Sequence, residues 1–172
     1  TCKPLSVQVN LRNPFIFANL ECWNPVFNKS AEEQMQLYRN LDFRQAWRQT
    51  FEEPRVFPGK WDRVDIQDVS NPALKKYEGK TVDDVARERG KTGLDTFLDL
   101  AIEDDLNIQY TMALFNADEN RVAELITHPN TMIGLSDGGA HVDMLCDAGY
   151  CTYLLGTWVR EKQLMPIERA VQ

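Results

Sequence analysis

The hydrophobic pattern of this chain switches repeatedly between a two-residue and a 3.6-residue period, and this alternation is the strongest constraint on its fold. Period-two runs predict strands, because successive side chains of a strand point to opposite faces. Apolar residues at helical spacing predict amphipathic helices. The predicted strands are residues 4–10, 61–69, 107–115 and 132–135, and the predicted helices lie at about 30–53, 81–90, 93–104, 118–128, 150–160 and 166–172. Strands that alternate with helices indicate an α/β fold.

Two of the predicted helices carry clear start signals. Ser30 followed by Glu33 is the residue pair of a capping box. Thr81 is a predicted N-cap with two aspartates in the first turn, where the positive end of the helix dipole favours them, and Gly90 is the predicted stop. The aromatic stretch 14–27 has the composition of an ordered loop, and its rings are expected to fill the core rather than to stack on a ligand.

Composition excludes several classes of protein. The formal net charge is −7 over 172 residues, and no cluster of Lys or Arg offsets it, so a nucleic-acid partner is not expected. No apolar run approaches the roughly 20 residues that span a bilayer, so no membrane partner is expected either. The four cysteines form no CxxC pair, which favours a reducing compartment and a cytoplasmic location. Because the chain begins at Thr1 without Met, we expect it to be a piece of a longer protein.

The most informative motif is the run Ile133-Gly134-Leu135-Ser136-Asp137-Gly138-Gly139-Ala140-His141. The run predicts an apolar strand with Ser136 and Asp137 at its carboxyl end. Parallel α/β barrels place their catalytic groups at the carboxyl ends of their strands. From the residues alone, the same four letters SDGG equally fit a turn capped by the aspartate. His141 alone fits a hydrogen-bonded structural histidine as well as a ligand. The two histidines of the chain cannot build a hydrolytic zinc site unaided.

A family resemblance extends over nearly the entire chain and is most specific after residue 105. The run GLSDGGAHVDMLCDAGYCTYLLGTWVRE, residues 134–161, is similar to the last barrel strand and following segment of amidohydrolases of the D-aminoacylase (N-acyl-D-amino-acid deacylase) type. The segment 4–10 resembles the penultimate barrel strand of that family. Further similar positions are Tyr77-Glu78-Gly79-Lys80, Asn116, Glu119, Val122, His128-Pro129 and Met132-Ile133-Gly134.

The resemblance implies a fold and a division of the chain. The fold would be a partial (β/α)8 TIM barrel that contains the last two barrel strands, with residues 4–10 and 132–135 as parallel neighbours. All of residues 1–172 would form the carboxyl-terminal portion of an amidohydrolase catalytic domain. Residues 14–105 would be a helix-rich insertion, and residues 106–172 would be the last β/α units. Exposed edges of the incomplete barrel would promote self-association.

The resemblance also implies a chemistry. The complete enzyme would be a Zn²⁺-dependent hydrolase that cleaves the amide bond of N-acyl-D-amino acids or related non-peptide C–N bonds. Zinc can lower the pKa of its bound water to about 7, and Asp137 would help to hold that water and accept its proton. Asp137 is thus the implied catalytic and metal residue, and the implied substrate-binding residues are Ser136, Gly138, Gly139 and His141.

One departure from the family pattern bears directly on activity. The paired histidines near the family's amino terminus, and those of its middle strands, have no counterpart in this sequence. We therefore expect the isolated chain to be inactive and the remaining zinc ligands to come from the full-length parent. Two other interpretations stay open, namely another amidohydrolase branch that acts on cyclic amides and a non-catalytic α/β binding module. Arg12, Arg160 and Trp23 are conceivable substrate contacts, but a structural role is the better expectation for each.

Overall fold

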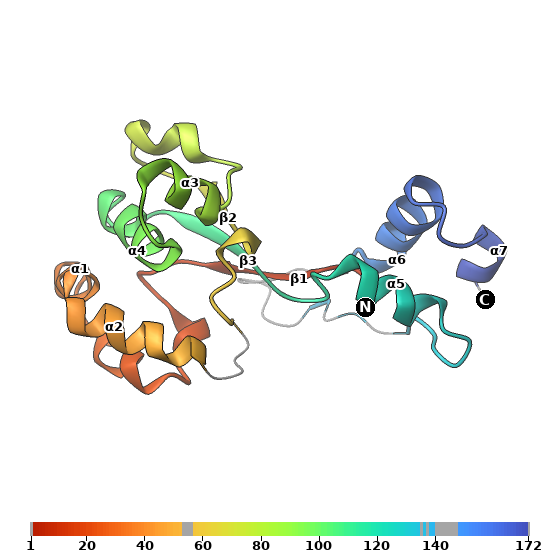
Figure 1. The fold of residues 1–172 in the computed structure, drawn as a ribbon, viewed down its shortest axis with the longest axis horizontal. Coiled ribbons are helices and arrows are strands. Elements are labelled where there is room, and N and C mark those ends of the chain that lie inside the picture. Colours follow the sequence, from red (N-terminus) through yellow and green to blue (C-terminus); the bar gives the residue numbers. More distant parts are fainter. Residues whose placement is uncertain (1, 53–56, 135, 137, 140–147, 172) are drawn as a thin grey trace. The chain divides into compact units, whose positions relative to one another are not determined.

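Three strands lie side by side in one sheet of the computed structural model, which describes residues 2–52, 57–134, 136, 138–139 and 148–171 (Figure 1). They are β1 (Leu5–Val9), β2 (Val64–Asp68) and β3 (Gln109–Phe115), in the order β1-β3-β2. β2 runs antiparallel to β3, with Val64 opposite Met112 and Ile66 opposite Tyr110. Together with the surrounding helices, this sheet confirms the predicted α/β class.

The sheet differs from the expected barrel segment in two respects. The antiparallel pairing of β2 with β3 is not a barrel pattern, because the strands of a (β/α)8 barrel are all parallel. The strand predicted at 132–135 is wrong over residues 132–134, which have no regular structure, and Leu135 lies outside the described residues. The neighbour of β1 in the sheet is β3. An apolar run of four residues was too short a signal to fix a strand, because short apolar runs are ambiguous.

The chain divides into two compact units. The central unit consists of residues 8–112, and the terminal unit joins residues 1–7 to residues 113–172. The predicted insertion at 14–105 and the predicted last β/α units at 106–172 depend on a complete barrel, so these boundaries stay predictions. We describe each unit by itself.

The first of two successive helices in the central unit begins at the cap that the sequence indicates. α1 (Ala31–Arg39) starts with a complete capping box, in which Ser30 Oγ accepts from the Glu33 amide at 3.3 Å and the Glu33 carboxylate accepts from the Ser30 amide at 2.9 Å. Asn40 both ends α1 and caps α2 (Leu41–Gln49). Because its Oδ1 satisfies amides of the first turn, one asparagine separates two helices without a longer loop.

α3 (Val82–Arg89) and α4 (Gly93–Glu103) confirm the other predicted helix signals. Thr81 caps α3 through a capping box, and Gly90 ends it in the left-handed conformation with φ of 64°. Figure 1 shows α3 beside α4 and near β2, and the three elements are in contact. α4 is the longest uninterrupted α-helix of the described residues, and no helix among them is long and apolar enough to cross a membrane.

Aromatic rings form the core of the central unit. The stretch 14–27 contributes two short 3-10 helices, Phe15–Phe17 and Glu21–Val26, which bury Phe17 and Trp23. These two burials confirm that the stretch fills the core. Neighbouring ring centroids of the cluster lie between 4.3 and 6.0 Å apart, within the range of favourable aromatic pairs. The aromatic cluster comprises Phe17, Trp23, Tyr38, Phe43, Trp47, Phe51, Phe57, Trp61, Phe97 and Tyr110.

A buried arginine joins α2 to α4. Arg44 is only 8% exposed, and its Nε donates to the Tyr38 carbonyl at 2.7 Å. Its two terminal nitrogens bind Asp95 at 2.9 Å and Asp99 at 2.6 Å. Lys91 adds a second cation at 2.6 Å from Asp99. The guanidinium therefore keeps its donors satisfied away from water, as a buried charge requires.

This network predicts a loss of stability in acid. Burial alone would raise the pKa of Asp99, but hydrogen bonds from Lys91 and Arg44 outweigh it and lower that pKa below the ordinary 3.8. The folded state then binds the proton less readily than the unfolded state, so the stabilisation is present above the unfolded pKa and is lost as the pH falls through the lowered value. At neutral pH we expect Asp99→Asn to reduce the free energy of unfolding by about 1.5–3 kcal/mol.

Urea unfolding of both proteins between about pH 6 and pH 2 measures this effect, and the two curves should converge toward the acid end. The matched control is Glu124→Gln, which removes an exposed ion pair with Arg121 and should cost less than about 1 kcal/mol. A difference between wild type and Asp99→Asn that does not change with pH would contradict the assignment.

The terminal unit packs helices against the amino-terminal segment. Its elements are α5 (Glu119–Thr127), α6 (Tyr150–Tyr153), a π-helical continuation over Leu154–Glu161, and α7 (Ile167–Ala170). Asp118 caps α5 through the Arg121 amide, as predicted. The core gathers Cys2, Val122, Leu154 and Trp158, and Trp158 Nε1 donates to the Cys2 carbonyl at 2.7 Å. This unit is therefore assembled from residues near both ends of the sequence.

Candidate functional site

The SDGG segment forms a tight turn over its described residues. The Gly138 amide donates to Ser136 Oγ at 3.3 Å. A side chain at Gly138 would place its Cβ 3.2 Å from the Ala148 backbone, and Gly139 has φ of 89°, a conformation that other residues rarely adopt. Both glycines are exposed and Ser136 is half-buried. Gly138 thus allows Ala148 to pack closely against the turn, whereas Gly139 leaves the backbone uncovered, with no other atom within 4 Å of its Cβ position.

Two of the predicted site residues, Asp137 and His141, lie outside the described residues. The structure therefore brings together Ser136, Gly138 and Gly139 as one turn, and the catalytic role of Asp137 and the substrate-binding role of His141 stay predictions. The two alternatives from the sequence, a catalytic strand end and a turn capped by the Asp137 side chain, therefore both stay open.

The described residues do not provide a set of zinc ligands. Among them, no group of three or more His, Cys, Asp or Glu side chains is placed to hold a metal ion. His128 is exposed, and its Nδ1 accepts from the Asn130 amide at 3.2 Å, which is a local turn contact. Since a catalytic zinc normally takes three protein ligands, this part of the chain does not fit a complete zinc site.

A groove in the terminal unit includes Ile133, the first residue of the predicted motif, in its lining. Its volume is about 550 Å³, and it is lined mainly by apolar side chains together with His128 and Arg169. Arg169 already donates from Nη2 to the Thr127 carbonyl. The lining comprises Ile126, His128, Pro129, Thr131, Met132, Ile133, Leu154, Met165, Arg169, Ala170 and Val171. Met132 is 84% exposed, so the segment before the motif presents apolar surface to solvent.

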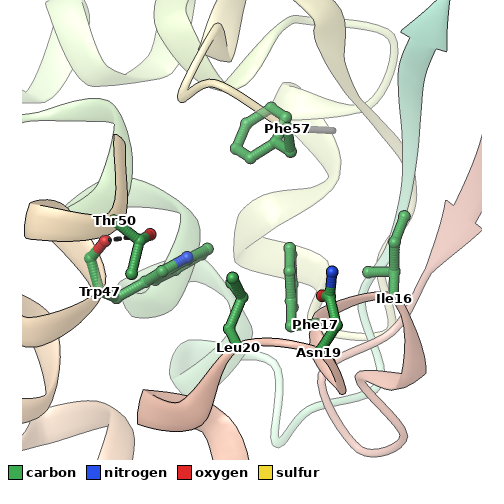
Figure 2. Close-up of a pocket in the computed structure, with 7 residues that line it drawn as sticks. All are labelled: Ile16, Phe17, Asn19, Leu20, Trp47, Thr50 and Phe57. Atoms are coloured by element: carbon green, nitrogen blue, oxygen red, sulfur yellow. Dashed lines mark hydrogen bonds between the residues drawn. The ribbon is translucent and has the colours of Figure 1, made fainter. Parts of the chain in front are cut away.

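A smaller cavity opens beside the aromatic cluster of the central unit (Figure 2). Its volume is about 30 Å³, and its lining comprises Ile16, Phe17, Asn19, Leu20, Trp47, Thr50 and Phe57. Figure 2 shows the Trp47 ring reaching from α2 toward Leu20 and Phe17. Thr50 Oγ1 donates to the Trp47 carbonyl at 2.7 Å. Trp47 is fully buried, and its Nε1 has no hydrogen-bond partner among the described residues.

Trp47 lies in the predicted helical region at about 30–53, but the sequence gave no sign of a cavity beside it. Helical spacing predicts that a side chain faces the core. Whether an indole N–H finds an acceptor there depends on side chains that come from distant parts of the sequence. The buried Nε1 therefore had no sequence signal.

Arg12, Arg160 and Trp23 have structural contacts. Trp23 is completely buried in the aromatic cluster, and Arg160 pairs with the adjacent Glu161 at 3.0 Å. Arg12 Nη2 donates to the Asp105 carbonyl at 2.9 Å, in a loop where Asp105 has a positive φ of 50°. The contacts of Trp23 and Arg12 agree with the structural roles expected for them, whereas the exposed Arg160 pair leaves the role of that residue a prediction.

Comparisons with known proteins give distant relatives. The chain is 31% identical over 113 residues to uncharacterized proteins of Mycobacterium bovis and of two strains of Mycobacterium tuberculosis. The aligned part covers 64% of this chain but 18% of each relative, so the chain spans about a fifth of their length. No family model matches the chain. No solved structure matches it either.

Proposed function

We propose that this chain supplies the SDGG turn to the active site of an amidohydrolase that cleaves the amide bond of N-acyl-D-amino acids. The observation that carries the proposal is the turn itself, because no atom lies within 4 Å of the place where a Cβ of Gly139 would be, so the backbone there is open to a substrate. A substrate amide could approach such a backbone closely. The match to relatives about five times as long as the aligned segment supports an active site completed by other parts of a longer protein.

Under this proposal β1 would be the penultimate strand of a (β/α)8 barrel, and residues 132–134, which have no regular structure in this chain, would form the last strand only when the rest of the barrel is present. The remaining strands would come from other parts of the longer protein. The antiparallel β2–β3 pair would then lie outside the barrel, because barrel strands run parallel. Self-association through exposed strand edges is part of the same proposal for the chain on its own.

The role assigned to this chain is proton transfer at the Asp137 carboxylate. Asp137 would accept the proton of the attacking water and donate it to the leaving amine, which is ordinary general acid–base catalysis. Zn²⁺ is proposed only for the complete site, and we assign no step of the reaction to it, because the described residues gather no ligand set. His141 and Ser136 would orient the substrate.

The test compares the 172-residue chain with the longer protein that contains it. We expect the chain alone to bind no stoichiometric zinc in equilibrium dialysis and to release no amino acid from N-acetyl-D-amino acids, because its two histidines and Asp137 do not complete a catalytic site. The longer protein should hydrolyse the D-substrates, with the N-acetyl-L-amino acids as the matched control.

Two results would refute the proposal in different ways. One tightly held zinc per isolated chain, accompanied by turnover, would show that the site is not shared with other segments. A longer protein that leaves every N-acyl-D-amino acid intact would remove the deacylase assignment and would favour either cyclic amides as substrates or a non-catalytic binding role.

A further inference from the structure

We propose that the groove around Met132 is an interface that a segment of the longer protein covers, and that this segment brings apolar side chains and a carboxylate. The groove lies within the terminal unit, is lined by residues between 126 and 171, and has a volume of about 550 Å³. The inference goes beyond the deacylase proposal, because it concerns what covers this surface and not the chemistry at Asp137.

Exposed apolar side chains are concentrated in the terminal unit. Six of the eight large hydrophobic side chains that are exposed among the described residues belong to it, although it is the smaller of the two units. Met132 is the most exposed of them at 84%, and Val171 in the same groove is also exposed. Single exposed hydrophobic residues are ordinary on protein surfaces, whereas apolar side chains gathered along one groove mark an interaction surface.

The groove is too open to be a pocket for a small molecule. A pocket of that kind buries about 70–90% or more of its ligand. Met132 and Arg169 line this groove and are themselves exposed, so they cannot enclose a ligand to that extent. A segment of a macromolecule, which covers the groove from outside, fits this geometry better.

The charges of the groove favour a segment that carries a carboxylate. The titratable side chains of its described lining are His128 and Arg169, and no Asp or Glu belongs to that lining. Arg169 donates from Nη2 to the Thr127 carbonyl and has no carboxylate partner in the part of the chain that the structure describes. Because a guanidinium has five N–H donors, it can bind a carboxylate in addition to this carbonyl.

The relatives indicate where the segment comes from. The aligned part covers 18% of each mycobacterial relative, so about four-fifths of each relative lies outside it. A segment of the same polypeptide is present at an effective concentration in the millimolar range, whereas a second copy of the chain must bind from dilute solution. We therefore assign the groove to a segment of the longer protein, and the test below distinguishes a second copy.

Oxidation of methionine by hydrogen peroxide measures whether the groove is covered. The peroxide converts the Met132 thioether to a sulfoxide and releases water, and peptide mass spectrometry gives the rate at each methionine. In the isolated chain the exposed Met132 should react about as fast as N-acetylmethionine amide, and in the longer protein at least about tenfold more slowly. Met112 is fully buried, so its slow oxidation shows in every sample that the protein is folded.

Three variants of the longer protein test the proposed carboxylate. Arg169→Glu should repel it and raise the rate of Met132 oxidation at least about threefold, whereas Arg169→Lys should keep most of the protection. Glu168→Gln is the matched control and should leave the rate unchanged, because Glu168 is exposed beside Arg169 but does not line the groove.

Three results would overturn the proposal. Equally fast oxidation of Met132 in the isolated chain and in the longer protein would show that no segment covers the groove. An Arg169→Glu variant with unchanged protection would remove the carboxylate. Protection in the isolated chain that grows with its concentration would identify a second copy as the occupant. None of these measurements uses hydrolysis, so a protected Met132 in a longer protein without deacylase activity would refute the proposed function alone.

Discussion

If the proposed deacylase activity is correct, replacement of Asp137 by Asn is expected to lower the turnover of the longer protein by about 100-fold to 10,000-fold, the usual contribution of a general acid or base. Asparagine keeps the size and hydrogen-bonding shape of the side chain but cannot take up the proton. Substrate affinity should change less than turnover, because the loss falls on the transition state. Steady-state kinetics with N-acetyl-D-amino acids measure both quantities.

His141→Ala is the companion variant for this prediction. If His141 only orients the substrate or supports the turn, its removal should cost less turnover than Asp137→Asn does. Near-normal hydrolysis by Asp137→Asn together with complete loss in His141→Ala would reverse the two roles. Circular dichroism of each variant shows whether the fold is intact, so that a loss of turnover can be attributed to the missing side chain and not to unfolding.

Replacement of Trp23 by Ala should destabilise the central unit by about 3–5 kcal/mol, the usual cost of truncating a buried aromatic side chain. Trp23 is fully buried and contacts four other rings, with its centroid 4.4 Å from Phe17 and 4.8 Å from Trp47. The loss approaches the whole stability of a small domain, which is about 5–15 kcal/mol.

Urea unfolding followed by circular dichroism measures this loss. Phe15→Ala is the matched control from the same segment, because the Phe15 ring is 57% exposed and its removal should change stability by less than about 0.5 kcal/mol. A similar, small effect of both variants would mean that the aromatic cluster does not hold the central unit together.

Local signals in the sequence predicted the helices well. The caps at Ser30, Thr81 and Asp118 act within three residues of themselves, so their hydrogen bonds follow from the sequence almost independently of the rest of the fold. The same is true of Gly90, whose left-handed backbone ends α3. These elements appear with boundaries within a few residues of those predicted.

Features that depend on distant residues were predicted less well. The order β1-β3-β2 and the antiparallel β2–β3 pair depend on which strand edges meet, and period-two patterning does not contain that information. The turn before β3 is held by Asn10, whose side-chain amide donates to the Leu106 and Ile108 carbonyls almost a hundred positions away. For the candidate site, the sequence predicted the SDGG motif and its family resemblance. The cavity beside Trp47 could not be predicted, because it depends on how distant residues pack in the core.

The construction of the terminal unit from two distant stretches has a consequence for synthesis on the ribosome. Trp158 donates to the Cys2 carbonyl across 156 positions, whereas the central unit is one continuous stretch, residues 8–112. Translation at roughly 5–20 residues per second adds Trp158 several seconds after Met112. The central unit can therefore fold while the chain is still growing, but the segment around Cys2 must wait for its partner and then close a long loop. Until that moment the terminal unit cannot form the core that joins Cys2 to Leu154 and Trp158.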